Sequence, residues 1–151
     1  MAQLSDDASI APGMFRDRVA QITRDLIRID TTNYGGNNSR GEPEAAAYCA
    51  AVMEAMDMAP EIVEYEPGRS SVVGRMRGSD PDAPALVLHG HIDVVPADAD
   101  EWSVDPFGAE VIDDVIYGRG AADMKAMDAI MLTALEYLHA QQLRPRRDII
   151  L

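Results

Sequence analysis

A short apolar run, Ala85–Leu88, is the feature that most constrains how this chain can fold. Every residue in it is apolar, which is typical of the start of a strand in a parallel sheet that helices cover on both faces. We therefore predict a central strand over residues 85–95. The run leads into the polar segment His89–Asp93, so side chains able to do chemistry would lie at its end.

Patterns typical of helices flank this strand. Apolar residues recur at steps of three and four over residues 15–29 and 42–58, and again from Met124 to Leu138, which predicts three amphipathic helices. Pro60 and Pro145 would end the second and third helices. The apolar positions expected on the inner face of the third helix are Met124, Met127, Ile130, Met131, Leu135 and Leu138.

Shorter strands and turns fill the rest of the chain. The pattern predicts a loop at 31–41, strands at 61–66 and 70–77, and a hairpin at 110–117 that turns at Asp113 and Asp114. Because helices alternate with apolar strands, we predict an α/β domain of three layers, with the sheet in the middle.

His91 and Asp93 stand two residues apart on the predicted central strand. Alternate residues of a strand share a face, so the two side chains should project side by side. A neutral imidazole is a good ligand for a divalent metal ion. A neighbouring carboxylate can accept the proton on the other ring nitrogen, which fixes the tautomer and makes the ligand more basic.

Asp123 follows the glycine-rich turn Gly118–Gly120 and precedes the third predicted helix. Such a turn lets the backbone approach closely and can deliver a carboxylate to the mouth of a sheet. One imidazole with an orienting carboxylate, together with a second carboxylate able to bridge, is what a hydrolytic metal centre requires of its protein.

Each of these residues has a simpler interpretation. His91 could be a core histidine whose ring is satisfied by Asp93 for structural reasons. Asp123 could cap the helix that follows it, although capping and metal binding are compatible because a carboxylate has two oxygens. A dinucleotide-binding loop is excluded, because Asp123 stands where the third glycine would be and would repel a pyrophosphate.

Three segments, in this order and spacing, resemble the M20 metallopeptidase and aminoacylase family, which includes acetylornithine deacetylases, succinyl-diaminopimelate desuccinylases and glutamate carboxypeptidases. The segments are His91–Pro96, Trp102 with Asp105–Phe107, and Tyr117–Lys125. The resemblance covers Leu86 to Leu135, with a weaker likeness through the N-terminal helices.

The resemblance implies roles for the residues already singled out. His91 would bind one metal ion, Asp93 would be the catalytic-site residue that orients the His91 ring, and Asp123 would bridge two ions. The cofactors implied are two divalent ions, with Zn²⁺ preferred and Co²⁺ or Mn²⁺ also suited to carboxylate-rich sites. The implied fold is the three-layer catalytic domain of zinc peptidases.

The chain departs from the family pattern at two places. Asp114 stands where the family's hairpin usually has glycine, a change that aspartate tolerates because it enters the left-handed conformation more easily than most residues. Ala126 and Met127 replace two glycines after Lys125, which should stiffen the start of the helix.

Three polar residues near the motifs receive structural interpretations. The family does not use the position of His89 as a ligand, so we expect this side chain to pack structurally. Arg119 and Lys125 are expected to form ion pairs that brace Asp123 or neighbouring acids.

Asp148–Leu151 is an apolar run that predicts a core strand. In the family this strand leads to a pair of glutamates, of which the first is the general base and the second a metal ligand. We therefore expect residues 1–151 to form the N-terminal part of a catalytic domain. The base, the remaining ligands and a lid domain that mediates dimerisation would lie outside this range, and residues 1–151 alone should be inactive.

The function that the resemblance implies is metal-dependent hydrolysis of an amide bond in a small peptide or an N-acyl amino acid, by an enzyme whose complete form could be a homodimer. The alternative is a non-catalytic fragment or degenerate relative with a structural or binding role.

The composition and the N-terminal sequence limit which binding partners and which cellular compartment we expect. The chain has 13 basic and 26 acidic side chains, a net charge of −13, which argues against nucleic acid or an anionic membrane surface as a partner. The single cysteine, Cys49, cannot form an internal disulfide. Residues 1–11 lack the basic start and apolar centre of a signal peptide, and no apolar run reaches the roughly 18 residues of a membrane span. We therefore expect a cytoplasmic protein.

Overall fold

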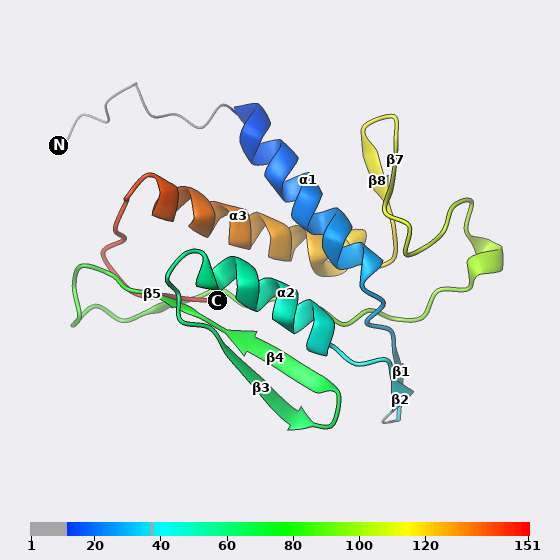
Figure 1. Ribbon diagram of the computed structural model, residues 1–151, viewed down its shortest axis with the longest axis horizontal. Coiled ribbons are helices and arrows are strands. Elements are labelled where there is room, and N and C mark those ends of the chain that lie inside the picture. The colour runs from blue at the N-terminus through cyan, green and yellow to red at the C-terminus, as the bar shows by residue number, and fades with distance from the viewer. Residues whose placement is uncertain (1–11, 37) are drawn as a thin grey trace.

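The computed structural model describes residues 12–36 and 38–151 (Figure 1). Its three main helices are α1 (Pro12–Arg28), α2 (Pro43–Glu54) and α3 (Ala126–Ala140). Its strands are β1 (Asn33–Gly35), β2 (Asn38–Ser39), β3 (Glu61–Glu66), β4 (Arg69–Val73), β5 (Arg75–Met76), β6 (Leu86–Val87), β7 (Glu110–Ile112), β8 (Val115–Tyr117) and β9 (Ile149–Ile150). The mixture of helices and strands confirms the predicted α/β class.

The central sheet has three strands in the order β5-β9-β6. The apolar run near the C-terminus forms its middle strand, β9, which pairs antiparallel with β5 and parallel with β6. Ile149 is buried between its neighbours. The core strand predicted from Asp148–Leu151 is therefore present, and it pairs with two segments that lie more than 60 residues earlier in the sequence.

The long central strand predicted over residues 85–95 was wrong in extent. Strand pairing covers only Leu86 and Val87, followed by one hydrogen bond from the Leu88 N–H to the Ile150 carbonyl. Leu86 and Val87 are 42% and 64% exposed, not buried on both faces. β6 pairs with Ile149 and Ile150 of β9, and the further pairing of residues 89–95 in the described part of the chain is an isolated parallel bridge between Thr32 and Val94.

The predicted strand 70–77 is divided in two at Gly74. β4 pairs with β3 in a hairpin, whereas β5 turns away to pair with β9. A side chain at Gly74 would press on Met53, at 2.9 Å from its sulfur, so the close approach of α2 explains the glycine. The second predicted helix also ends earlier than expected, at Glu54, because the chain turns at Asp57 and Ala59, both with positive φ.

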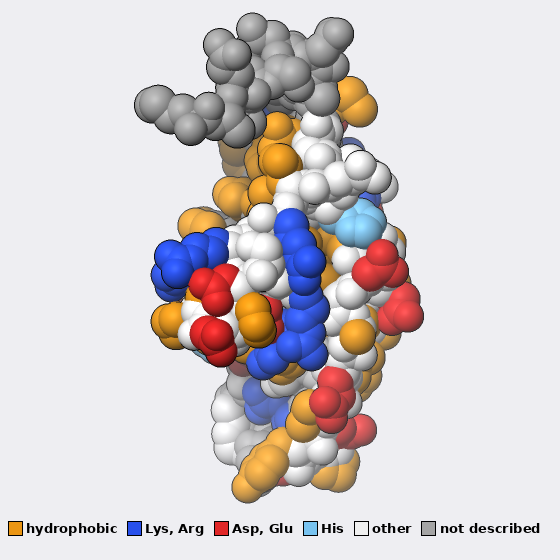
Figure 2. Space-filling view, turned by 90° about the vertical axis from the view of Figure 1, so that its left-hand side faces the viewer, with side chains coloured by type: hydrophobic (Ala, Val, Ile, Leu, Met, Phe, Trp, Pro, Cys, Tyr) orange, Lys and Arg blue, Asp and Glu red, His pale blue; other side chains and the backbone are white. Residues whose placement is uncertain are grey.

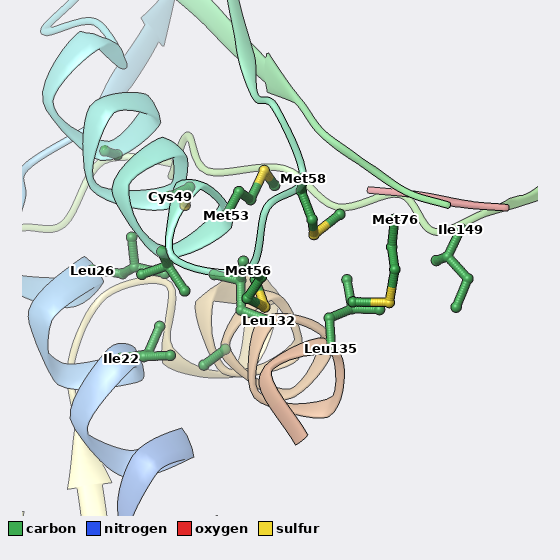
Figure 3. Packing of buried hydrophobic residues seen from close by; sticks show 13 residues of the cluster. Ile22, Leu26, Cys49, Met53, Met56, Met58, Met76, Leu132, Leu135 and Ile149 are labelled. Atoms are coloured by element: carbon green, nitrogen blue, oxygen red, sulfur yellow. The ribbon is translucent and has the colours of Figure 1, made fainter. Parts of the chain in front are cut away.

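The core lies between the three helices and the strands (Figure 3). Ile22 and Leu26 of α1 meet Leu132 and Leu135 of α3. Methionines are prominent, and their flexible thioethers fill irregular gaps. The buried methionines of the cluster are Met53, Met56, Met58 and Met76.

The inner face predicted for α3 is only partly correct. Leu135 is buried, but Met127 and Ile130 are 49% and 41% exposed. The buried stripe instead comprises Asp128, Ala129, Leu132, Thr133 and Leu135. The backbone at Asp123 and Met124 is not helical. Met124 therefore lies outside the regular helix, and the apolar repeat predicted for the helix cannot begin there.

The surface at the left of Figure 1 carries side chains of both charges close together, although the chain is acidic overall (Figure 2). Arg146 forms two hydrogen bonds with Asp80, and Arg75 and Arg77 both approach Asp148. Exposed pairs of this kind contribute about 0–1 kcal/mol each. Within residues 12–36 and 38–151, no helix combines the length and apolar character that a membrane crossing requires.

Lys125 is fully buried and caps the end of α1. Its ammonium group donates to the carbonyls of Leu26 and Ile29, at 2.8 and 2.9 Å. Desolvation lowers its pKa to about 8. The prediction that Lys125 pairs with Asp123 or a neighbouring acid was therefore wrong, because the carbonyls at the helix terminus, which attract positive charge, lie closer.

Asp128 is a buried acid whose carboxylate has few hydrogen bonds to replace those it would make with water. It is 7% exposed, and its Oδ2 has no hydrogen-bond partner in the described residues. Its Oδ1 lies against Gly90, where any side chain would collide with it. Desolvation raises its pKa to about 7, even though the charges of His91 and Lys125 act to lower it.

Replacing Asp128 with Asn should increase the free energy of unfolding near pH 8. The pKa of Asp128 is higher in the folded protein than in the unfolded chain. Its contribution to the free energy of unfolding is therefore complete below about pH 4 and is lost as the pH rises through about 7. Since one pKa unit corresponds to about 1.4 kcal/mol, the gain should be on the order of 2–4 kcal/mol.

Urea denaturation near pH 4 and pH 8 measures this effect, with exposed Asp82→Asn as the control. A D128N chain that is no more stable than wild type at the higher pH would show that Asp128 is compensated.

Candidate metal centre

Hydrogen bonds between the segment after α1 and the segment after β6 hold the candidate site together. The Val94 N–H donates to the Thr31 carbonyl, and the Asn33 N–H donates to the Val94 carbonyl. The Thr31 hydroxyl donates to the Ile92 carbonyl at 2.5 Å. Val94 is buried, whereas His91 is exposed. The backbone around His91 is thus fixed by side-by-side pairing with residues 31–33, outside the main sheet.

The structure brings His91 and Asp123 together across 32 residues of sequence. His91 Nε2 lies 2.9 Å from Asp123 Oδ1. Gly120 supplies the turn that makes this possible, with φ of 82°. A side chain there would collide with Val94, so the glycine-rich approach to Asp123 is required sterically.

The capping interpretation of Asp123 is not supported. The residue that immediately precedes α3 is Lys125, and no side-chain capping hydrogen bond is formed there. Asp123 lies in extended backbone and its side chain is 87% exposed. Its carboxylate is therefore open to solvent and to a ligand.

Asp93 contacts the opposite side of the His91 ring. Its Oδ1 is 3.3 Å and its backbone oxygen 3.1 Å from His91 Nδ1. Its Oδ2 accepts a hydrogen bond from the Asn33 side-chain amide at 3.0 Å and lies 3.8 Å from the Arg69 guanidinium. The three residues singled out from the sequence are thus adjacent, and their roles as ligands and orienting acid stay predictions.

The His91 ring has an oxygen acceptor at each nitrogen. Partial desolvation acts to lower its pKa, but the hydrogen bonds to Asp123 and to the Asp93 backbone, with both carboxylate charges, raise the pKa overall. A neutral imidazole carries one N–H and can satisfy only one of the two contacts. The site therefore favours a positive charge on or beside the ring, supplied by a second proton or by a metal ion.

The chemistry of these donors suits a divalent metal, but the donor set is small. His91, Asp93 and Asp123 line a pocket of about 350 Å³. In the described part of the chain, no group of three or more His, Cys, Asp and Glu side chains is arranged to hold a metal ion. An imidazole and a carboxylate provide two of the four ligands that zinc usually takes.

Other residues near the site differ from expectation. His89 is exposed rather than packed. The guanidinium of Arg119 stacks on Trp102, 5.4 Å from the ring centroid, and makes no ion pair with Asp123. Sequence reasoning missed Asn33 and Arg69, which reach Asp93 from two different hairpins; no pattern in the sequence links them to it.

In metal-free buffer with a chelator, Asp123→Asn should lower the pKa of His91, because the variant loses one of the two negative charges beside the ring. An NMR titration of the His91 ring measures the change. Asp113→Asn in the exposed β7–β8 hairpin is the control. An unchanged His91 pKa in D123N would mean that the two side chains are not adjacent in solution.

Comparison with known proteins identifies the family of the chain. The model of peptidase family M20/M25/M40 matches residues 87–151. A succinyl-diaminopimelate desuccinylase of Rhodospirillum centenum is 36% identical over 116 residues, which are 76% of this chain and 28% of that protein. The chain thus spans less than a third of the length of this relative.

Solved structures show the same fold. An M20 family metallo-carboxypeptidase from Sulfolobus solfataricus superposes with a TM-score of 0.75 at 22% identity, covering 89% of this chain and 30% of that one. A Bacillus subtilis protein described as a dinuclear metal-binding peptidase from the M20 family gives 0.62 at 18%, covering 93% and 35%. These findings confirm the resemblance drawn from the three sequence segments: the chain belongs to peptidase family M20/M25/M40.

Proposed function

We propose that the protein takes part in metal-dependent hydrolysis of amide bonds in small peptides or N-acyl amino acids. The observation that carries the proposal is the 2.9 Å approach of His91 Nε2 to Asp123 Oδ1, with Asp93 on the other side of the ring. The relatives support the substrate class, because they include an enzyme that removes a succinyl group and a carboxypeptidase.

In this proposal each residue has a distinct task. Asp93 accepts the N–H of His91 Nδ1, which leaves the Nε2 lone pair for a metal ion. Asp123 would be the second ligand, and because its side chain is 87% exposed, its carboxylate would be able to bind a further ion as well. Since both acids stand beside the ring, their charges favour cation binding at this edge.

Two divalent ions held here would polarise the amide carbonyl and lower the pKa of water. Zn²⁺ suits an imidazole with carboxylates best, and Co²⁺ or Mn²⁺ are also suitable. The general base and the remaining ligands are proposed to lie after residue 151. We therefore propose that the complete site needs those groups. Dimerisation and a cytoplasmic location also stay predictions.

The alternative is a non-catalytic role in structure or binding. It is favoured by one observation, the absence of any group of three potential metal-binding side chains among the described residues. Metal affinity distinguishes the two, because a purely structural role does not require His91 and Asp123 to hold an ion.

His91→Ala and Asp123→Ala should each weaken the binding of Zn²⁺ to the 151-residue chain by about tenfold or more, because each removes one of two donors. Isothermal titration calorimetry at a pH above the pKa of His91 measures the affinity, since the ligand must be deprotonated. His89→Ala is the matched control, because it removes an exposed histidine two residues away. Equal affinity in all four proteins would contradict the assignment.

The 151-residue chain should not hydrolyse dipeptides or N-acyl amino acids when Zn²⁺ or Co²⁺ is added, because no general base has been assigned within it. Release of free amine from N-acetyl and N-succinyl amino acids is the assay. Turnover above the metal-only blank would show that the base lies within residues 1–151, with Asp98, Asp105, Glu110, Asp113 and Asp114 as the first candidates.

A further inference from the structure

We infer that Arg119 is a specificity-determining residue of the candidate site: its guanidinium binds a carboxylate group of the ligand that enters the pocket beside His91. The inference rests on the proposed function for the identity of this ligand as the substrate, whereas carboxylate binding itself can be measured without metal. It narrows the proposed substrates to amides that carry a free carboxylate close to the bond that is cleaved.

The backbone of Arg119 is held by close packing on both sides. A side chain at Gly118 would come within 2.5 Å of Ile27 in α1, and a side chain at Gly120 would come within 2.4 Å of Val94. Ile27 and Val94 are both buried, so the turn is enclosed between α1 and the segment that follows β6. The point from which the Arg119 side chain leaves the backbone is therefore fixed relative to the candidate site.

The side chain of Arg119 is oriented by a neighbour that does not neutralise its charge. Its guanidinium stacks on Trp102, 5.4 Å from the ring centroid, and its Nε is buried without a hydrogen-bond partner among the described residues. Stacking uses the face of the planar group and leaves the N–H donors at its edge. Within residues 12–36 and 38–151 Arg119 forms no ion pair, because Asp93 and Asp123 face His91 instead.

Arg119 lines the same pocket of about 350 Å³ as His91, Asp93 and Asp123. Among the described residues around this pocket, it is the side chain with a permanent positive charge. The pocket therefore contains two carboxylates and an imidazole, which attract a cation, together with a guanidinium, which attracts an anion. A ligand with a negative group can be oriented there by Arg119, at the side chains proposed to bind metal.

A carboxylate is the anion that matches this arrangement. A guanidinium presents parallel N–H donors that can bind both oxygens of one carboxylate, which adds geometric specificity to the attraction of charge. An N-acyl amino acid carries its carboxylate on the carbon attached to the amide nitrogen, so a single small pocket can hold both groups. A neutral amide in place of the carboxylate lacks the charge and the second acceptor oxygen.

The test compares the binding of N-acetylglycine and of its neutral analogue N-acetylglycinamide to the ¹⁵N-labelled 151-residue chain, in buffer with a chelator. NMR titration gives both dissociation constants, and the Arg119 Nε–H resonance should shift with the acid but not with the amide. Because hydrogen bonds to charged groups are stronger than those between neutral groups, wild type should bind the acid about five- to tenfold more tightly.

Three variants separate the role of Arg119 from a general effect of charge. Arg119→Met keeps an apolar stem beside Trp102 but loses the charge, so the acid and the amide should bind equally. Arg119→Lys keeps the charge without the parallel donors and should retain a smaller preference for the acid. Arg77→Met is the control, because it removes an exposed arginine that pairs with Asp148 and does not line the pocket.

Equal binding of the two compounds to wild type, or an undiminished preference in R119M, would overturn the inference. Should R119M not fold, R119K decides the question, because a full preference in R119K would mean that no two-oxygen contact is formed. Zn²⁺ affinity separates the inference from the proposed function. If the preference depends on Arg119 while Zn²⁺ affinity is independent of His91 and Asp123, the carboxylate site stands and the metal function fails. The reverse result keeps the metal function and refutes the carboxylate site.

Discussion

The hydrogen bonds between Thr31–Asn33 and Ile92–Val94 are the interaction on which the candidate site depends. They connect the end of α1 to the segment that carries His91 and Asp93, at a place where the main sheet no longer provides strand pairing. Lys125 reinforces the same junction by binding the last carbonyls of α1, and it lies two residues after Asp123. One junction therefore positions both halves of the site.

Much of this arrangement follows from local sequence. Apolar periodicity located α1 and the interior strand β9, and a glycine-rich turn identified the approach to Asp123. The turn at Asp113 and Asp114 adopts positive φ at both residues, which agrees with the expectation that Asp114 enters the left-handed conformation in place of a glycine. These features depend on neighbouring residues, so the sequence contains enough information to predict them.

Features that depend on distant partners could not be predicted in the same way. β6 forms where it pairs with β9, a partner about 60 residues later in the sequence. The buried stripe of α3 is set by packing and not by its most apolar positions. Lys125 binds carbonyls at the end of α1 and Arg119 stacks on the Trp102 ring, although both were predicted to pair with acids. Asn33 contacts Asp93 because residues 31–33 pair with the segment around Val94. Periodicity carries no information on such contacts.

The central claim is that the imidazole of His91 and the carboxylate of Asp123 bind the same metal ion. X-ray absorption spectroscopy of the Zn²⁺-loaded chain tests it most directly, because it identifies the donor atoms. The account predicts one imidazole nitrogen among oxygen donors, with the imidazole signal lost in His91→Ala and retained in His89→Ala. A spectrum without imidazole, or one with sulfur from Cys49, would contradict it.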